Sequence, residues 1–388
     1  MIRSVIDYGR SFVIGAMDER IRGLMLAHWR TPSVDVAVDH DQALRDAVGY
    51  LLRAQEQGQD DGLRSYHLIK GWGSSYPETT GYAIPTLLAA GAHLNWNEPK
   101  EAAKRAAEWL LSVQRPDGGW QGGRVGEERP SIVFNTAQVI RGMLAMHAHT
   151  GEAKYVESAL RAGRWIASVQ DGDGAWRASN FLGVARVYDT YVDAPLLHLA
   201  HVTGDKALGQ AALRNLEWVL SQRHPNGWFA NADNTTEHNA RPITHTVAYT
   251  LDGLVECSMH TGDTRYREAA LNAALELAEL FLERGLLSGR YDRQWRGSEH
   301  LITTGCAQLA IIWSRLENEQ HMREARDRMI VLLTDIQARS SVGPVVVKGA
   351  MPGSFPLWGR YEKFAFPNWG TKYLADALLC AQGQLPAF

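Results

Sequence analysis

The sequence has little that would suit nucleic acid, a membrane or a metal. Its 40 Lys and Arg residues are balanced by 43 Asp and Glu residues, so it offers no basic surface for nucleic acid. No stretch approaches the roughly 18 apolar residues of a transmembrane helix. The three cysteines, Cys257, Cys306 and Cys380, are odd in number and lack metal-ligand spacing, so we expect reduced, buried thiols. No phosphate-binding glycine loop stands out, and we expect neither a metal nor a cofactor.

The N-terminal region lacks the apolar core of a signal peptide. Charged residues at Asp7, Asp18 and Glu19 interrupt it, and we therefore expect a cytoplasmic protein. Residues 1–39 are expected to form a helical arm. Within it, apolar residues recur at helical spacing, which suits packing on the protein or attachment to a membrane surface: Val5, Phe12, Ile14, Met17, Ile21 and Leu24.

A repeated pattern dominates the rest of the chain. Three segments, Trp109–Trp120, Trp165–Trp176 and Trp218–Trp228, each read as the end of an amphipathic helix stopped by a Gly or Pro turn. A degenerate copy runs from Tyr50 through Gln55 to Gly62. We interpret the tryptophans of this motif mainly as packing residues.

Between these copies lie six apolar helices that are rich in small residues. They are expected to start near Thr79, Asn135, Asp189, Thr244, Thr303 and Asn368, where Thr, Asn or Asp could cap the first turn. Charged, one-faced helices alternate with these apolar ones, as half-solvated helices alternate with buried helices. Six such pairs can close on themselves, so the sequence predicts one all-α (α/α)₆ toroid over residues 40–388.

Parallel inner helices would bring their six N-termini to one cleft. The segments at these starts are rich in aromatic rings beside carboxylates, amides and imidazoles, which suit a sugar because its apolar faces stack on rings. The candidate site residues are Trp72, Tyr76, Glu78, Tyr82, Asn135, Asp189, Tyr191, Asp193, His238, Asn239, Arg241, His245, Glu299, Asn368 and Trp369. Because a helix start favours Asp, Thr or Asn for capping alone, about half of these polar residues could be structural.

Two spacings resemble the Gln-Trp motif of squalene and hopene cyclases and related prenyltransferases. They are Gln114…Gly118…Trp120 and Gln170…Gly174…Trp176. The resemblance implies an α/α barrel. The acidic motif with which such cyclases protonate an isoprenoid is not found, since Asp189-Thr-Tyr-Val-Asp193 differs from it. Isoprenoid chemistry therefore stays a minor alternative.

A second resemblance lies in Tyr76-Pro-Glu78-Thr-Thr-Gly81-Tyr82. It is similar to the first inner helix of (α/α)₆ bacterial endoglucanases, which implies that Glu78 is a general acid; the Thr-Thr pair differs from the small residues of that pattern. The whole chain resembles toroidal proteins of bacterial surface-polysaccharide loci. That group includes glycoside hydrolases, polysaccharide lyases and uronyl C5-epimerases.

Three functions follow for a bacterial surface polysaccharide or exopolysaccharide, acidic or neutral. Inverting hydrolysis would use Glu78 as acid and Asp189 or Asp193 as base across the barrel mouth. A lyase or C5-epimerase would use His245 or Tyr191 as base, with Asn239 and Arg241 holding a uronate carboxylate. A glycan-binding module without catalysis would need only the aromatic rings.

Overall fold

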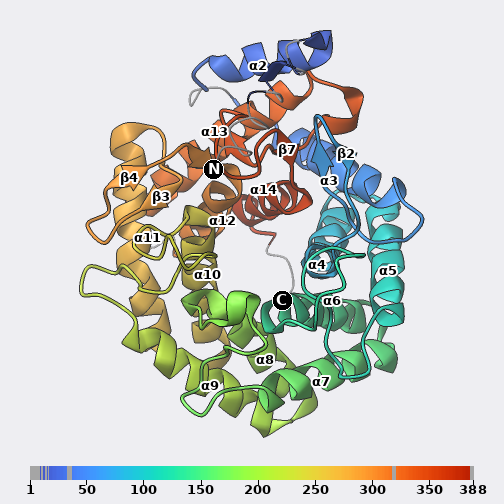
Figure 1. Ribbon diagram of the computed structural model, residues 1–388, viewed down its shortest axis with the longest axis vertical. Helices are drawn as coiled ribbons and strands as arrows, with labels where there is room; N and C mark the ends of the chain where they lie inside the picture. The colour runs from blue at the N-terminus through green and yellow to red at the C-terminus, as the bar shows by residue number, and fades with distance from the viewer. Residues whose placement is uncertain are drawn as a thin grey trace.

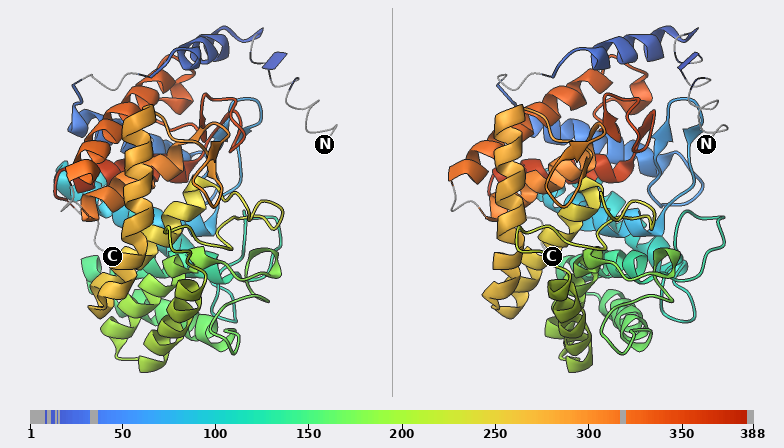
Figure 2. Two further views of the ribbon diagram at one scale, coloured as in Figure 1. Left: turned by 90° about the vertical axis from the view of Figure 1, so that its left-hand side faces the viewer. Right: turned by 60° about the vertical axis from the view of Figure 1, so that its left-hand side comes forward.

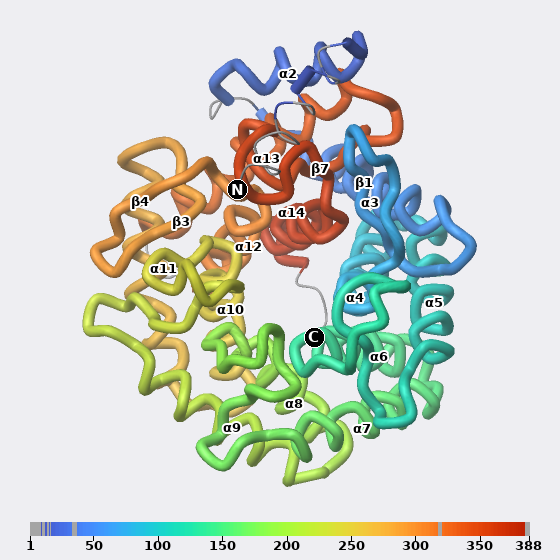
Figure 3. The backbone as a smooth tube through the Cα atoms, viewed as in Figure 1, coloured from blue at the N-terminus to red at the C-terminus, as the bar shows by residue number. Residues whose placement is uncertain are grey.

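The computed structural model describes residues 9, 12–13, 15, 17–32, 37–316 and 320–384. Within them, six outer helices alternate with six inner helices in a closed ring, so the (α/α)₆ toroid predicted from the sequence is confirmed (Figures 1 and 3). The outer helices are α3 (His40–Glu56), α5 (Asn97–Ser112), α7 (Ala153–Ser168), α9 (Lys206–Ser221), α11 (Thr264–Arg284) and α13 (Gln320–Ser340). The inner helices are α4 (Pro77–His93), α6 (Val133–Thr150), α8 (Thr190–Thr203), α10 (Thr244–Thr261), α12 (Thr303–Arg315) and α14 (Asn368–Ala381).

The long loops gather at the end of the ring where the inner helices begin, as the side views show (Figure 2). Short strands brace these loops. β1 (Tyr66–His67) lies between β2 (Gly71–Trp72) and β7 (Ala365–Phe366), both antiparallel to it. β3 (Arg290–Tyr291) pairs with β4 (Gly297–Ser298), and β5 (Leu301–Ile302) pairs with β6 (Ser354–Phe355). Because β1 follows α3 and β7 precedes α14, the first sheet joins the first helix pair to the last.

The glutamines of the repeat motif connect neighbouring outer helices. The side-chain Nε2 of Gln55, Gln114 and Gln170 donates to a carbonyl oxygen of the next outer helix, at Ala102, Ser158 and Ala211 respectively. Gln337 on α13 does the same to the carbonyl oxygen of Ala43 on α3, at 3.0 Å, and so connects the last outer helix to the first. The repeat is therefore a structural connector.

The tryptophans that end two of the motifs are packing residues, as expected. Trp120 and Trp176 are fully buried. Each indole Nε1 donates to a carbonyl oxygen of the preceding outer helix, Leu110 or Ile166. A buried indole with its N–H satisfied anchors the turn to the helix before it.

The expectation that Thr, Asn or Asp side chains cap the inner helices is wrong. None of the six described inner helices has a side-chain hydrogen bond at its N-cap, and Asp189, the one acidic N-cap among them, points elsewhere. Thr80 and Thr136 instead accept hydrogen bonds from the backbone N–H of Leu63 and Trp120 in the preceding loops. Their hydroxyls fix loops. The first backbone N–H of α6, α10 and α12 donates to a loop carbonyl oxygen, and that of α14 donates to the Ser65 hydroxyl.

Glycines allow the first two inner helices to touch. A Cβ on Gly81 of α4 would lie 2.6 Å from the Cα of Val139 on α6, and a Cβ on Gly142 would lie 2.4 Å from the carbonyl oxygen of Gly81. Gly81, part of the endoglucanase-like segment, is therefore required for helix packing. The close approach brings Glu78 and Asn135, one turn earlier on each helix, into contact.

Charged side chains fill the barrel interior beyond the cavity. Arg141 pairs with Glu256 at 2.7 Å, Arg315 bridges Glu256 and Asp252, and Lys372 pairs with Asp376 at 2.6 Å; all six are buried. These charges depart from the apolar inner helices that the sequence predicts. Three cations balance three carboxylates, which is the condition for keeping charges in a dry core.

The N-terminal arm includes α2 (Glu19–Trp29), which packs on α13 with Ile21 and Leu24 buried, whereas Met17 is exposed. Val5 and Ile14 of the predicted apolar stripe lie outside the described residues. All three cysteines are buried and unpaired, as expected. Among the described helices, none has the length and hydropathy to cross a bilayer.

Candidate functional site

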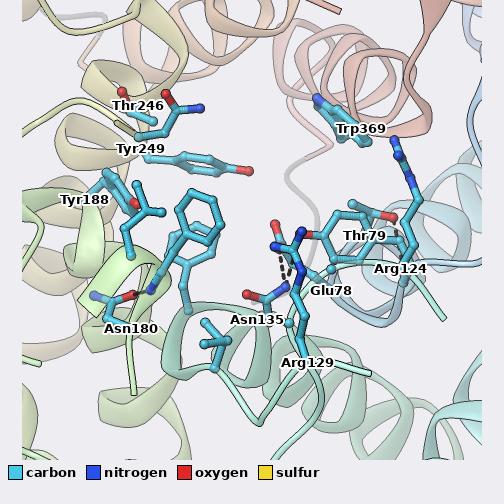
Figure 4. Close-up of a pocket in the computed structure, with 18 of the residues that line it drawn as sticks. Glu78, Thr79, Arg124, Arg129, Asn135, Asn180, Tyr188, Thr246, Tyr249 and Trp369 are labelled. Atoms are coloured by element: carbon cyan, nitrogen blue, oxygen red, sulfur yellow. Dashed lines mark hydrogen bonds between the residues drawn. The ribbon is translucent and has the colours of Figure 1, made fainter. Parts of the chain in front are cut away.

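A cavity of about 600 Å³ opens where the inner helices begin (Figure 4). This volume is in the usual range of small-molecule sites. Six of the predicted residues line it: Tyr76, Glu78, Tyr82, Asn135, His245 and Trp369. Their side chains come from α4, α6, α10 and α14 or from the residue just before them, as expected for a ring of converging N-termini.

Glu78 lies on the cavity wall with only 8% of its surface exposed. The Nδ2 of Asn135 donates to Glu78 Oε2 at 2.7 Å and also to the hydroxyl of Tyr76 at 3.1 Å. Burial raises the pKa of Glu78 to about 7, and a hydrogen bond from Tyr76 opposes this shift in part. Glu78 is therefore a carboxyl that can hold or release a proton near neutral pH.

His245 faces the same cavity from α10. Its Nδ1 lies 2.7 Å from Gln308 Oε1, so Nδ1 carries the proton because the amide oxygen can only accept. Burial lowers the pKa of His245 to about 4, which keeps the ring neutral and leaves Nε2 with a free lone pair. The ring packs on Tyr249, one helical turn later, with centroids 4.5 Å apart.

Two arginines and a second carboxyl group complete the polar side of the cavity. Arg124 and Arg129 lie on the loop between α5 and α6, and Glu362 lies before α14. The Arg124 side chain has no hydrogen-bond or ion-pair partner among the described residues, whereas Arg129 Nε pairs with Glu127 at 3.0 Å. Glu362 has a left-handed backbone (φ 44°), a conformation that costs energy for a non-glycine residue. Burial raises its pKa, and Arg124 and Lys70 oppose that shift.

The structure places the two predicted bases outside the cavity. Asp189 is fully buried behind the cavity-lining Asn180, whose Nδ2 donates to it at 2.6 Å. Burial raises the pKa of Asp189 to about 8, so it is largely a neutral acid. Asp193 faces the outer helix α9, where Asn215 Nδ2 donates to it at 2.7 Å. Neither is placed to activate a water beside Glu78.

The alternative base, Tyr191, also lies outside the cavity. It sits deeper in the barrel, where its hydroxyl accepts from Tyr373 at 3.2 Å and its ring packs under Arg141. Asn239 accepts a hydrogen bond from Arg186, and Arg241 pairs with Asp292 at 3.4 Å, so the expected carboxylate clamp is not assembled.

The remaining candidates brace loops. Trp72 packs on Tyr50 and Tyr66. His238 is exposed and contacts the Thr235 hydroxyl. Glu299 pairs with Arg290 and Arg360, and Asn368 donates to the carbonyl oxygen of Arg64.

The candidate list omitted several lining residues. They include Tyr249, Phe134, Asn180, Thr246, Arg124 and Arg129. Tyr249 could have been found, because it follows His245 by four residues and shares its helix face. The arginines lie on a loop without periodicity, so no pattern in the sequence marks them.

Comparison of the sequence with known families finds the cyclases. The squalene-hopene cyclase C-terminal domain matches residues 92–181. The chain is 29% identical to a squalene–hopene cyclase of Zymomonas mobilis over 154 residues, which cover 37% of this chain and 20% of the cyclase. It is 24% identical to lanosterol synthase of Pneumocystis carinii over 229 residues, 49% of this chain and 29% of the synthase. The chain thus spans less than a third of these curated relatives.

Comparison with solved structures finds carbohydrate-active toroids. An unsaturated glucuronyl hydrolase specific for heparin superposes with a TM-score of 0.68 at 13% identity, over 89% of this chain and 97% of the hydrolase. The unsaturated glucuronyl hydrolase of Bacillus sp. GL1 gives 0.63 at 16% identity, over 88% and 96%. An α-amylase of Clostridium perfringens gives 0.63 at 11% identity, over 89% and 99%.

The resemblance to the cyclases and the resemblance to carbohydrate-active toroids are thereby confirmed, each at a different level. The cyclase match covers the first two Gln-Trp segments, whose glutamines connect outer helices in this structure. The structural matches cover nearly the whole ring, and at such low identity they establish the (α/α)₆ fold.

Proposed function

We propose that this protein is a glycoside hydrolase that acts on a bacterial surface polysaccharide or exopolysaccharide, with Glu78 as the general acid. The observation that carries the proposal is the position of Glu78: a buried carboxyl group with a pKa of about 7, on the wall of an aromatic-lined cavity. Unsaturated glucuronyl hydrolases and an α-amylase share the fold, which supports a carbohydrate substrate.

The second carboxyl group is assigned to Glu362 in place of Asp189. Among the described residues, the carboxyl groups that line the cavity are those of Glu78, Glu127 and Glu362. Burial raises the pKa of Tyr361, and the nearby carboxylates of Glu362 and Glu78 raise it further. Glu127, in contrast, is engaged by Arg129. In the proposed reaction, Glu78 gives its proton to the glycosidic oxygen as the bond to the anomeric carbon breaks. Glu362 takes a proton from the water that attacks that carbon.

An acidic glycan fits the charge of the cavity. The Arg124 guanidinium lines the cavity and has no ion-pair partner among the described residues. The N-terminus of α4 has no side-chain cap, and its positive end lies beside Glu78. A uronate carboxylate could pair with Arg124 in the way proposed earlier for Arg241.

The decisive experiment is product analysis with a panel of acidic and neutral bacterial polysaccharides. A hydrolase releases new reducing ends without absorbance near the ultraviolet edge. Glu78→Gln should then lower kcat by two to four orders of magnitude, about 3–5 kcal/mol of barrier, and leave KM nearly unchanged. Glu299→Gln, outside the cavity, is the matched control. Full activity in Glu78→Gln would refute the assignment.

A lyase or C5-epimerase is the second candidate, and the pairing of neutral His245 with Tyr249 favours it. Nε2 of His245 is available to take a proton α to a carboxylate, and the Tyr249 ring packs on the imidazole and lines the same cavity. Under this function His245→Ala or Tyr249→Phe should abolish activity, Glu78→Gln should retain much of it, and lyase products should absorb in the ultraviolet.

A further inference from the structure

The cavity has two chemically different sides. Glu78, Arg124 and Glu362 lie on one side with Asn135. The other side is formed by residues 130–134 at the start of α6 and by the loop that precedes α8. Its lining is largely carbon: Pro130, Ile132, Phe134, Ala178, Phe181 and Leu182. We call these six residues the apolar side.

Asn180, the amide within this loop, directs its polar atoms away from a ligand. Its Nδ2 donates to Asp189, and its Oδ1 accepts from the backbone N–H of Phe181 at 2.9 Å. Both ends of the amide are therefore used inside the protein. A sugar ring placed here would find few hydrogen-bond partners for its hydroxyls, which argues against a second sugar subsite.

The loop displays its two largest apolar side chains at the mouth. Phe181 is 38% exposed and Leu182 is 55% exposed. Leu182 has a left-handed backbone (φ 61°, ψ 13°), which is unfavourable for a residue with a branched side chain. Exposed apolar surface on a strained loop at a cavity mouth is a feature that a ligand can stabilise by covering it.

The apolar side is continuous with the site of proposed bond cleavage. The ring of Phe134 meets Tyr188 edge-to-face at 5.3 Å and Tyr249 at 5.2 Å, so aromatic surface runs from the apolar side to the centre of the cavity. A group attached to a sugar on the polar side can therefore reach Phe134, Phe181 and Leu182 along this surface.

We propose that this protein acts on a glycan with an aliphatic aglycone, and that the apolar side binds the chain. The position of the sugar in this inference rests on the proposed function. The binding site for the aliphatic chain rests on Phe181, Leu182 and their neighbours. Burying methylene groups against these side chains would strengthen binding without further hydrogen bonds.

A binding measurement tests this inference independently of the proposed catalysis. The affinities of octyl β-D-glucuronide, below its micellar concentration, and methyl β-D-glucuronide are compared by titration calorimetry with the full chain. We expect the octyl compound to bind at least about tenfold more tightly, because burying methylene groups against apolar side chains strengthens binding and the mouth buries part of the chain. Phe181→Ser/Leu182→Ser should reduce this preference to less than about threefold. Val342→Ser, an exposed valine far from the cavity (56% exposed), should retain it.

Three results would overturn the aliphatic assignment. One is equal affinity for the two glucuronides, and another is an undiminished preference in the Phe181→Ser/Leu182→Ser variant. The third is tighter binding of phenyl β-D-glucuronide than of the octyl compound, which would assign the loop to ring stacking. An octyl preference together with full activity in Glu78→Gln would refute the proposed hydrolysis and leave the chain site intact. Loss of activity in Glu78→Gln without an octyl preference would do the reverse.

Discussion

Asn135 on α6 donates a hydrogen bond of 2.7 Å to the carboxyl group of Glu78 on α4. Burial raises the pKa of Glu78, whereas an amide N–H that donates to a carboxylate favours its charged form. Asn135→Leu should therefore raise that pKa further and move the alkaline limb of the pH–rate profile to higher pH. Asn234→Leu, at another amide of the lining, is the control and should leave the limb in place. A limb that moves to lower pH in Asn135→Leu contradicts this account.

Glu78 should also make the stability of the protein depend on pH. Its folded pKa of about 7 lies above the ordinary value of 4.5, so the folded state holds this proton more tightly than the unfolded state. Stability from this group is complete below about pH 4.5 and is lost as the pH rises to about 7, by about 3 kcal/mol in total. Glu78→Gln should remove the effect and unfold at higher denaturant concentration than the parent above pH 7. Parallel pH dependences for the two proteins would show that Glu78 is ionised in the fold.

His245 should act in the opposite direction. Its folded pKa of about 4 lies below the ordinary 6.5, so the unfolded state binds the proton first as the pH falls. The folded protein should lose stability between about pH 6.5 and pH 4, and His245→Gln should lose less over that range. Urea unfolding at pH 7 and pH 4.5 measures the difference. His321→Gln, an exposed histidine on α13, serves as the control.

The buried charges of the barrel interior are expected to be sensitive to the loss of one partner. Arg315 pairs with both Asp252 and Glu256, and each side chain is almost fully buried. Arg315→Met would leave two carboxylates without this cation and should lower the free energy of unfolding by about 3–5 kcal/mol. Arg360→Met removes an exposed partner of Glu299 and should cost at most about 1 kcal/mol. Equal losses in the two variants would show that the interior charges are solvated.

The ring could be predicted from the sequence because its signals are periodic. The predicted starts at Thr244, Thr303 and Asn368 agree exactly with α10, α12 and α14, and the others differ by one or two residues. The Gly and Pro turns mark the ends of the helices, and the alternation of amphipathic and fully apolar helices distinguishes outer from inner helices. Glu78 could be proposed from the sequence by another route, because it lies in a short segment that resembles a known family.

The inward-facing residues could be predicted only in part. A helix that is apolar on all sides has no distinct polar face, so its sequence does not show which side faces the cavity. The directions of the Asp193 and Tyr191 side chains therefore could not be predicted from the sequence. Asp193 faces α9 and Tyr191 faces the barrel interior, although they are two residues apart. Arg241 was misplaced because Asp292, its partner, is distant in the sequence.

The circle closes through residues that are synthesised far apart in time. Gln337 reaches Ala43 across 294 positions, α3 packs against α14, and β1 pairs with β7. A nascent chain that has not yet released α13 and α14 from the ribosome therefore has its first helix pair uncovered on one flank. Until the last helices emerge, it resembles an open solenoid with two bare ends. We therefore expect ring closure to be a late event in folding. The segment around α3 should be the last part of the chain to complete its tertiary contacts.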